Sequence, residues 1–190
     1  IIEELTSMTN LLKNYRISLN EIINEIQHEE FQYQQEQILQ YQERIELLKF
    51  IMPNKPEGMD IVASGHVAAA LQTQIKEAKA FIETGIDAYV FISNRFAKAD
   101  ESDDILFENM KYVVDALPDI PFGVYECPYP YKRVLTPELL KKMADDGRFH
   151  FLKDTCCDTE MLKAKHEAVK GSNLKIFNAN AATFLQSLRM

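Results

Sequence analysis

Short apolar runs recur along the chain at a nearly constant spacing, and this repeat constrains the fold more than any other feature. The runs cover residues 59–64, 88–93, 121–126, 148–153 and 174–179. Their centres are 28, 34, 28 and 24 positions apart, and amphipathic segments with apolar residues three or four positions apart separate them. Such alternation predicts parallel strands joined by crossover helices, which is an α/β fold.

Five strand-helix repeats are compatible with two architectures, a doubly wound sheet or part of an eight-stranded barrel. The spacing alone does not choose between them. No GxGxxG or Walker loop follows any of the apolar runs, which disfavours a nucleotide-binding doubly wound fold. A complete barrel usually needs about 250 residues. With 190 residues, we therefore expect at most a partial or truncated (β/α)8 barrel.

The N-terminal part of the chain has a different texture. Residues 1–52 contain no glycine and no strand-like alternation, and their apolar residues follow one another at steps of three and four. Pro53 and Gly58 then supply turn chemistry. We predict a helical N-terminal region over residues 1–52 and a β/α barrel portion over 53–190, in a single domain overall.

Composition excludes several classes of function. A formal net charge of -8 and a pI near 5.1 argue against a nucleic-acid-binding protein, which needs clustered basic residues. No apolar stretch approaches the roughly 18 residues that span a bilayer, and the first residues lack the basic start of a signal peptide. Three cysteines without zinc-ligand spacing fit a reducing compartment. We expect a cytoplasmic protein that binds neither nucleic acid nor membrane.

Metal binding is not indicated either. The four histidines lie on separate predicted elements without HxH or HExxH spacing, and they are His28, His66, His150 and His166. The acidic residues 100–104 lack the calcium-loop pattern, so we interpret them as a solvated loop in which Asp103 caps the next helix. We interpret Cys156 and Cys157 as small buried packing residues.

Lys153 is the most informative polar residue, because it ends the apolar run 148–153. Functional side chains of α/β folds gather at the carboxyl ends of the strands. An apolar strand covered on both sides would desolvate Lys153, and a neutral lysine amine can attack a ketone to form a Schiff base. Alternatively, Lys153 is simply the last strand residue, in water or paired with Asp154.

A second segment favours the chemical interpretation. The stretch VYECP places Tyr125 and Pro128 at the end of one strand, and FLKDT places Lys153 at the end of the next, 28 positions after Tyr125. In type, order and spacing these residues resemble the dihydrodipicolinate synthase/N-acetylneuraminate lyase family of class I Schiff-base aldolases. Its members have a Tyr-x-x-Pro motif on the fifth barrel strand and a Schiff-base lysine on the sixth.

The resemblance extends over residues 41–188, roughly three quarters of the chain. YQERIELL resembles the helix after the second strand of the family's barrel, IVASG the third strand, TGIDAYVFIS the fourth and IFNANAATFL the seventh. It implies a partial barrel with about five recognisable strand-helix units. It also implies a homo-oligomer, because members of the family are commonly tetramers.

The resemblance further implies a reaction and a set of site residues. Lys153 would form an imine with the C2 carbonyl of pyruvate or a related 2-oxo acid, and Tyr125 would shuttle protons. Ala179, Ser64 and Gly65 would contact the substrate. The family forms or cleaves a carbon-carbon bond through the lysine imine, so no cofactor or metal is expected.

This sequence departs from the family pattern at several points. The Gly-Thr-Thr-Gly-Glu loop that binds the pyruvate carboxylate has no counterpart before Tyr41. Phe96 stands where a second relay tyrosine is expected, and Pro130 stands where dihydrodipicolinate synthases have an arginine. An open sheet would also expose strand edges. An alternative is therefore a non-catalytic barrel remnant that acts as an interaction or assembly protein through its helical N-terminus.

Overall fold

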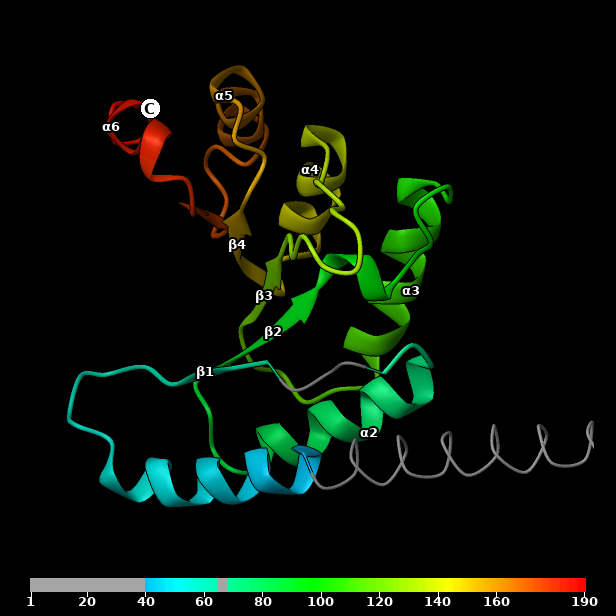
Figure 1. Ribbon diagram of the computed structural model, residues 1–190, viewed down its shortest axis with the longest axis vertical. Helices are drawn as coiled ribbons and strands as arrows, with labels where there is room; N and C mark the ends of the chain where they lie inside the picture. The colour runs from blue at the N-terminus through cyan, green and yellow to red at the C-terminus, as the bar shows by residue number, and fades with distance from the viewer. Residues whose placement is uncertain (1–39, 65–67) are drawn as a thin grey trace, which may run out of the picture. The chain divides into compact units, whose positions relative to one another are not determined.

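The computed structural model describes residues 40–64 and 68–190 (Figure 1). Residues 40–51 are helical and lead into the short 3-10 helix η1 (Met52–Asn54). The part from Ile45 to Met190 forms one compact unit. Most of the predicted helical region 1–52 lies outside the described residues, as do Gly65 and His66.

Five strands form one sheet, as the repeat predicted. They are β1 (Val62–Ala63), β2 (Ala88–Ile92), β3 (Phe122–Tyr125), β4 (Phe149–Asp154) and β5 (Lys175–Asn178). All neighbouring pairs are parallel, and the order in the sheet is the order in the chain. A doubly wound sheet would reverse its strand order at a switch point, whereas a barrel never does. The topology is therefore that of a partial (β/α)8 barrel.

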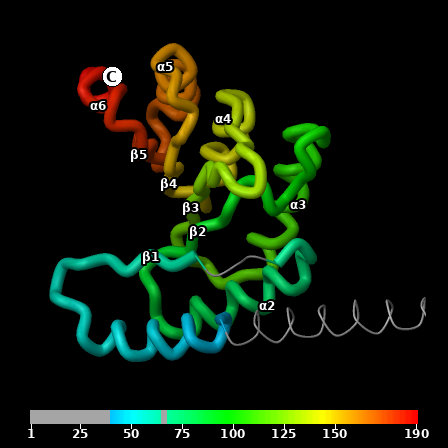
Figure 2. Tube along the Cα trace, viewed as in Figure 1, coloured from blue at the N-terminus to red at the C-terminus, as the bar shows by residue number. Residues whose placement is uncertain are grey.

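A helix follows each strand. They are α2 (Leu71–Ile82), α3 (Asp103–Asp115), α4 (Pro137–Asp146), α5 (Thr159–Ala168) and α6 (Phe184–Ser187). Two further 3-10 turns, η2 (Ser93–Arg95) and η3 (Ala181–Thr183), lie just after β2 and β5. Figures 1 and 2 show α2 to α5 following one another along the same side of the sheet.

The hydrophobic core lies between the sheet and these helices. Tyr89 and Phe91 of β2 are fully buried, and so are Phe122 and Phe149 on the next two strands. The rings of Tyr89 and Phe91 make an edge contact at 5.1 Å between centroids. Because side chains alternate along a strand, the residues between these aromatics point to the other face of the sheet. One face is therefore packed, and the opposite face is available for a site.

Helix starts are set by local side-chain bonds. The Thr136 hydroxyl accepts a hydrogen bond from the Leu139 amide, with Pro137 as the first residue of α4. The prediction for α3 was wrong by one residue, because Ser102 and not Asp103 caps it. The Asp103 carboxylate instead pairs with Arg133 at 2.8 Å and accepts the Thr136 hydroxyl at 2.7 Å. It thereby ties α3 to the start of α4.

Candidate active site

The face of the sheet opposite the helices forms a cavity of about 950 Å³. Its walls come from all five strands, and at the carboxyl ends of β3 and β4 the lining residues Tyr125 and Lys153 alternate with the buried Val124 and Leu152. One lining residue from each strand is, in chain order, Val62, Val90, Tyr125, Lys153 and Phe177. The carboxyl end of this cavity is the part where barrel chemistry is normally built.

Tyr125 and Lys153 lie next to each other at this end. They are register partners across the β3–β4 pairing, and both line the cavity. The Nζ atom of Lys153 lies 4.1 Å from the centroid of the Tyr125 ring. At that distance the ring face attracts a cationic amine. The two groups are thus close enough to contact one small ketone together.

The expected burial of Lys153 is not observed. The sequence suggested a strand covered on both sides, but the Lys153 side chain is exposed, because no element among residues 40–64 and 68–190 covers the cavity face. The alternative interpretation, in which Lys153 is simply the last strand residue and lies in water, is met in part, because its side chain is exposed. However, β4 continues to Asp154, whose carboxylate pairs with Lys165 and not with Lys153.

Tyr125 is half-buried at the same position. Burial raises the pKa of its phenol, and the neighbouring Cys127 side chain raises this pKa further. The phenol therefore stays protonated well above neutral pH. In that form it is a proton donor, which is the state that an acid catalyst needs.

The other predicted site residues differ in whether they line the cavity. Ser64 directly follows β1 and lines the cavity. Gly65 lies outside the described residues. Ala179 directly follows β5 and is exposed, but it is not among the lining residues. Its amide already donates to the Asp154 carbonyl oxygen at 3.0 Å, so a substrate contact from Ala179 would use its carbonyl group.

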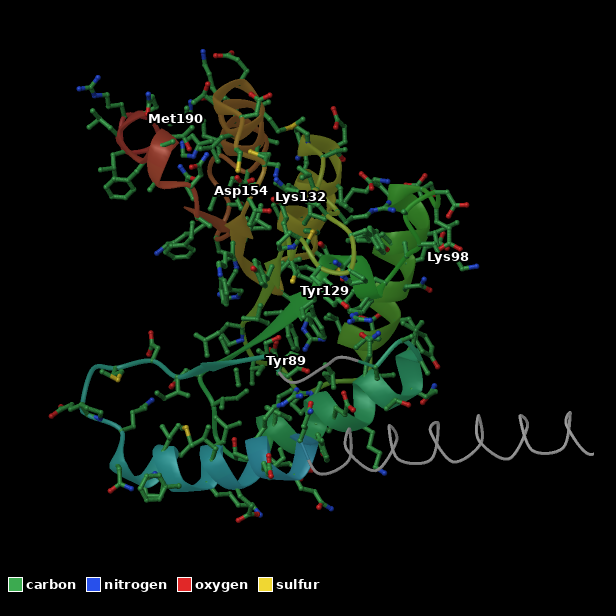
Figure 3. The ribbon with its side chains drawn as sticks, viewed as in Figure 1. Tyr89, Lys98, Tyr129, Lys132, Asp154 and Met190 are labelled. Atoms are coloured by element: carbon green, nitrogen blue, oxygen red, sulfur yellow. The ribbon has the colours of Figure 1, made fainter. Side chains whose placement is uncertain are left out.

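Two residues near the site are structural. Phe96 is 2% exposed and packs its ring edge-on against Phe91 at 5.4 Å, so it belongs to the core. Asn94, which sequence reasoning missed, organises the loop after β3, where Figure 3 labels Tyr129. Its Nδ2 atom donates to the carbonyl oxygens of Cys127, Tyr129 and Tyr131 at 2.9, 3.0 and 2.6 Å. A single amide thereby holds the segment that follows Tyr125.

A buried cluster of three charged side chains was also missed. Glu126, Asp154 and Lys165 are at most 1% exposed. The Lys165 ammonium lies 2.6 Å from Glu126 Oε1 and 2.5 Å from Asp154 Oδ2. Figure 3 labels Asp154 at the end of β4, near α5, which carries Lys165. The signal was present in the sequence, because Lys165 stands in the apolar stripe of its helix between Leu162 and Val169.

Glu126 is the most constrained member of this cluster. Its Oε1 atom accepts the Leu135 amide and its Oε2 atom the Thr155 amide, both at 2.8 Å. Burial raises the pKa of this carboxyl, although Lys165 and the amide of Thr155 act in the opposite direction. Two carboxyl groups therefore share one ammonium inside the protein, which is costly unless the geometry is well defined.

Metal and thiol chemistry find little support in the described part of the chain. There, no group of three or more His, Cys, Asp or Glu side chains could hold a metal ion. All three cysteines are free. The prediction of buried packing cysteines was wrong, since Cys157 is exposed and Cys156 is only partly buried. Burial still raises the pKa of the Cys156 thiol to about 11.

Across residues 40–64 and 68–190, none of the helices has the length and apolar character of a membrane span.

No family model and no curated protein matches the sequence. Several solved structures match the fold of the chain. YagE from E. coli K12, a prophage protein of the dihydrodipicolinic acid synthase family solved in complex with pyruvate, is 20% identical with a TM-score of 0.67. The 2-keto 3-deoxygluconate aldolase from Picrophilus torridus is 16% identical with a TM-score of 0.64. The dihydrodipicolinate synthase from Acinetobacter baumannii, complexed with pyruvate, is 19% identical with a TM-score of 0.66.

The extent of these matches is nearly the same in each case. The similarity covers 78% of this chain but only 50%, 52% and 49% of the three proteins. The chain thus spans about half the length of the structures that it matches. At such low identity the likeness concerns the fold and not the reaction. The described chain has the fold of about half of a barrel of the dihydrodipicolinate synthase family.

Proposed function

We propose that the protein is a pyruvate-dependent Schiff-base aldolase or lyase of the dihydrodipicolinate synthase family, with Lys153 as its nucleophile. The observation that carries the proposal is the pairing of Tyr125 and Lys153. They are register partners on adjacent strands, face the same cavity and lie 4.1 Å apart, measured from Nζ to the ring centroid. The fold of solved proteins that bind pyruvate supports the same assignment.

The proposed reaction begins with attack of the Lys153 amine on the C2 carbonyl of a 2-oxo acid. Tyr125 donates its proton to the carbonyl oxygen as the carbinolamine forms, and loss of water then gives the imine. The cationic imine accepts the electron pair of the bond at C3, so a carbon-carbon bond there can form or break. The Tyr125 phenol carries its proton at neutral pH, so it has a proton to donate.

Substrate contacts complete the proposal. Ser64 offers a hydroxyl group at the cavity, and Lys175 offers a second cationic side chain on the same face. A small 2-oxo acid such as pyruvate fits this combination, because its carboxylate needs hydrogen-bond donors. Gly65 and Ala179 remain proposed backbone contacts. The imine itself supplies the electron sink, so the proposed chemistry requires no cofactor.

Assembly with further copies is part of the same proposal. Val62 and Phe177, on the two outer strands of the described sheet, are 48% and 58% exposed. Exposed apolar side chains on outer strands favour a covering chain, and a homo-oligomer would provide one. A cytoplasmic location stays a prediction from the cysteine pattern.

Reductive trapping tests the proposed nucleophile. The chain is incubated with pyruvate and sodium borohydride, and intact mass spectrometry measures the product. We expect one reduced pyruvate per wild-type chain and none in Lys153→Ala. Lys163→Ala is the matched control, because Lys163 is an exposed lysine of α5 that does not line this cavity, and it should keep the adduct. An adduct that persists in Lys153→Ala would refute the assignment.

The open cavity favours a second candidate function, that of a non-catalytic barrel remnant in an assembly. Lys153 is exposed, and the chain spans half of the barrels that it matches. This candidate predicts no pyruvate adduct on the wild type. It also predicts a stable homo- or hetero-oligomer, which light scattering would detect.

A further inference from the structure

The buried charge cluster lies directly behind the proposed catalytic pair. Glu126 follows Tyr125 in the chain, and Asp154 follows Lys153. Since successive side chains of a strand point to opposite faces, Tyr125 and Lys153 face the cavity while the two carboxylates face α5. Lys165 of α5 bonds both carboxylates. One helix residue therefore holds the two strand ends that present the pair.

Backbone bonds extend the same connection. The Glu126 amide donates to the Lys153 carbonyl at 3.3 Å, and the Thr155 hydroxyl donates to the Glu126 carbonyl at 2.7 Å. The Cys156 amide donates to Asp154 Oδ1 at 3.1 Å. Rotation of either strand end would leave a buried charge without its partner, which is unfavourable. The cluster thus restricts how Tyr125 and Lys153 can turn relative to each other.

A role in stability alone does not explain this arrangement. Replacing a buried ion cluster by apolar residues of similar volume is often neutral or stabilising. Lys165 stands among apolar neighbours on its helix, such as Leu162 and Val169, where an apolar residue would pack without the cost of desolvation. Charges retained at such a position are better explained by a requirement for defined geometry.

We propose that Lys165 is a positioning residue, which acts through Glu126 and Asp154 to hold Tyr125 and Lys153 facing each other at the cavity. The inference rests on the proposed function, because that function makes the pair reactive. It predicts a measurable change at Lys153, even though Lys165 lies on the opposite side of the sheet and touches no substrate.

Two measurements on the full chain test the proposal. The first is the rate at which acetic anhydride acetylates Lys153 across a pH series, read by peptide mass mapping, which requires no catalysis. The second is the rate of reductive trapping with pyruvate. Lys165→Met is compared with Lys163→Met, the matched control, because Lys163 is an exposed lysine of the same helix.

We expect Lys165→Met to shift the acetylation profile of Lys153 several-fold. It should also slow pyruvate trapping by about 10- to 100-fold, as misplacement of a reacting group by about 1 Å does. Lys163→Met should match the wild type in both measurements. A merely structural role would lower the melting temperature and leave Lys153 acetylation in the folded protein unchanged. That result in folded Lys165→Met would overturn the proposal.

The remaining outcomes are also decisive. If Lys165→Met does not fold, the triple variant Lys165→Met, Glu126→Gln, Asp154→Asn removes the buried charges together. An unchanged Lys153 profile in that folded variant overturns the proposal, and a several-fold shift supports it. If the wild type forms no pyruvate adduct but Lys165→Met shifts the profile, the proposed function fails while the positioning role stands.

Discussion

Two lysines, Lys153 on β4 and Lys165 on α5, show how the two faces of one sheet differ in the burial of the same side chain. Lys153 is exposed in the cavity, beside the ring of Tyr125. Lys165 is completely buried behind the sheet, between two carboxylates. Lys153 follows the apolar residues Phe151 and Leu152, and Lys165 stands on the same face of its helix as Leu162. What decides burial is whether another element covers the face, and on the described residues only the helix side is covered. The cavity side therefore holds an exposed amine, and the helix side holds a buried ion cluster.

The largest expected effect breaks the helix side of this comparison. Lys165→Met leaves two buried carboxylates without their cation, so we expect the free energy of unfolding to fall by about 3–5 kcal/mol. Urea denaturation followed by circular dichroism measures it. Lys163→Met should change the same quantity by less than about 0.5 kcal/mol. Equal effects from both variants would show that the cluster contributes no more than a surface lysine.

A smaller effect probes packing on the cavity side. A Cβ atom added at Gly123 would lie 2.1 Å from Cε2 of Phe151, so the ring must move in Gly123→Ala. Overpacking costs about 1–3 kcal/mol. We expect a value at the low end, because Phe151 borders the open cavity and its ring can turn into it.

The double variant Gly123→Ala, Phe151→Leu sharpens this test. Removal of the ring should recover part of the stability lost in Gly123→Ala, as measured by the same denaturation experiment. No recovery would mean that the cost comes from the backbone of β3 and not from the ring contact.

A pH experiment separates the buried carboxyl from the rest of the molecule. The pKa of Glu126 is raised above its ordinary value of 4.5. Below pH 4.5 the group is protonated in both the folded and the unfolded chain. As the pH rises from 4.5 through the raised pKa, the unfolded chain releases the proton first, so this group lowers stability progressively. The variant Glu126→Gln has no ionisable group at this position, so it should not show this pH-dependent fall in stability.

The measurement is the free energy of unfolding of both proteins between pH 4 and neutrality. The stability of wild type relative to Glu126→Gln should decline as the pH rises. In Glu126→Gln the side-chain NH2 group would face the backbone N–H of Thr155, so that two donors oppose each other. This adds a cost to the variant that does not depend on pH. Parallel curves for the two proteins would contradict a raised pKa at Glu126.

The smallest expected effect concerns Lys153 itself. Because its side chain is exposed, Lys153→Met should change the free energy of unfolding by about 0.5 kcal/mol or less. Loss of the pyruvate adduct in this variant could then not be attributed to unfolding. A loss of stability comparable to that of Lys165→Met would remove the distinction between the two faces.

Much of the fold could be predicted from local patterns. The five strands lie at the predicted apolar runs. β1 has only two residues, shorter than the predicted run. These boundaries depend on pairing with neighbours, which a local pattern does not contain.

For the site, the sequence alone determined which residues stand at the ends of neighbouring strands. Tyr125 and Lys153 could be paired from strand spacing, because the period of two in a strand and the crossover helix place them at the same edge. The hydrogen bonds of Asn94 and Lys165 could not be predicted in this way, because their side chains join segments that lie 11 to 39 positions apart in the chain. Tertiary structure alone decided which face is covered, and hence which lysine is buried. Burial depends on elements distant in the chain, whereas strand alternation is a local property of the backbone.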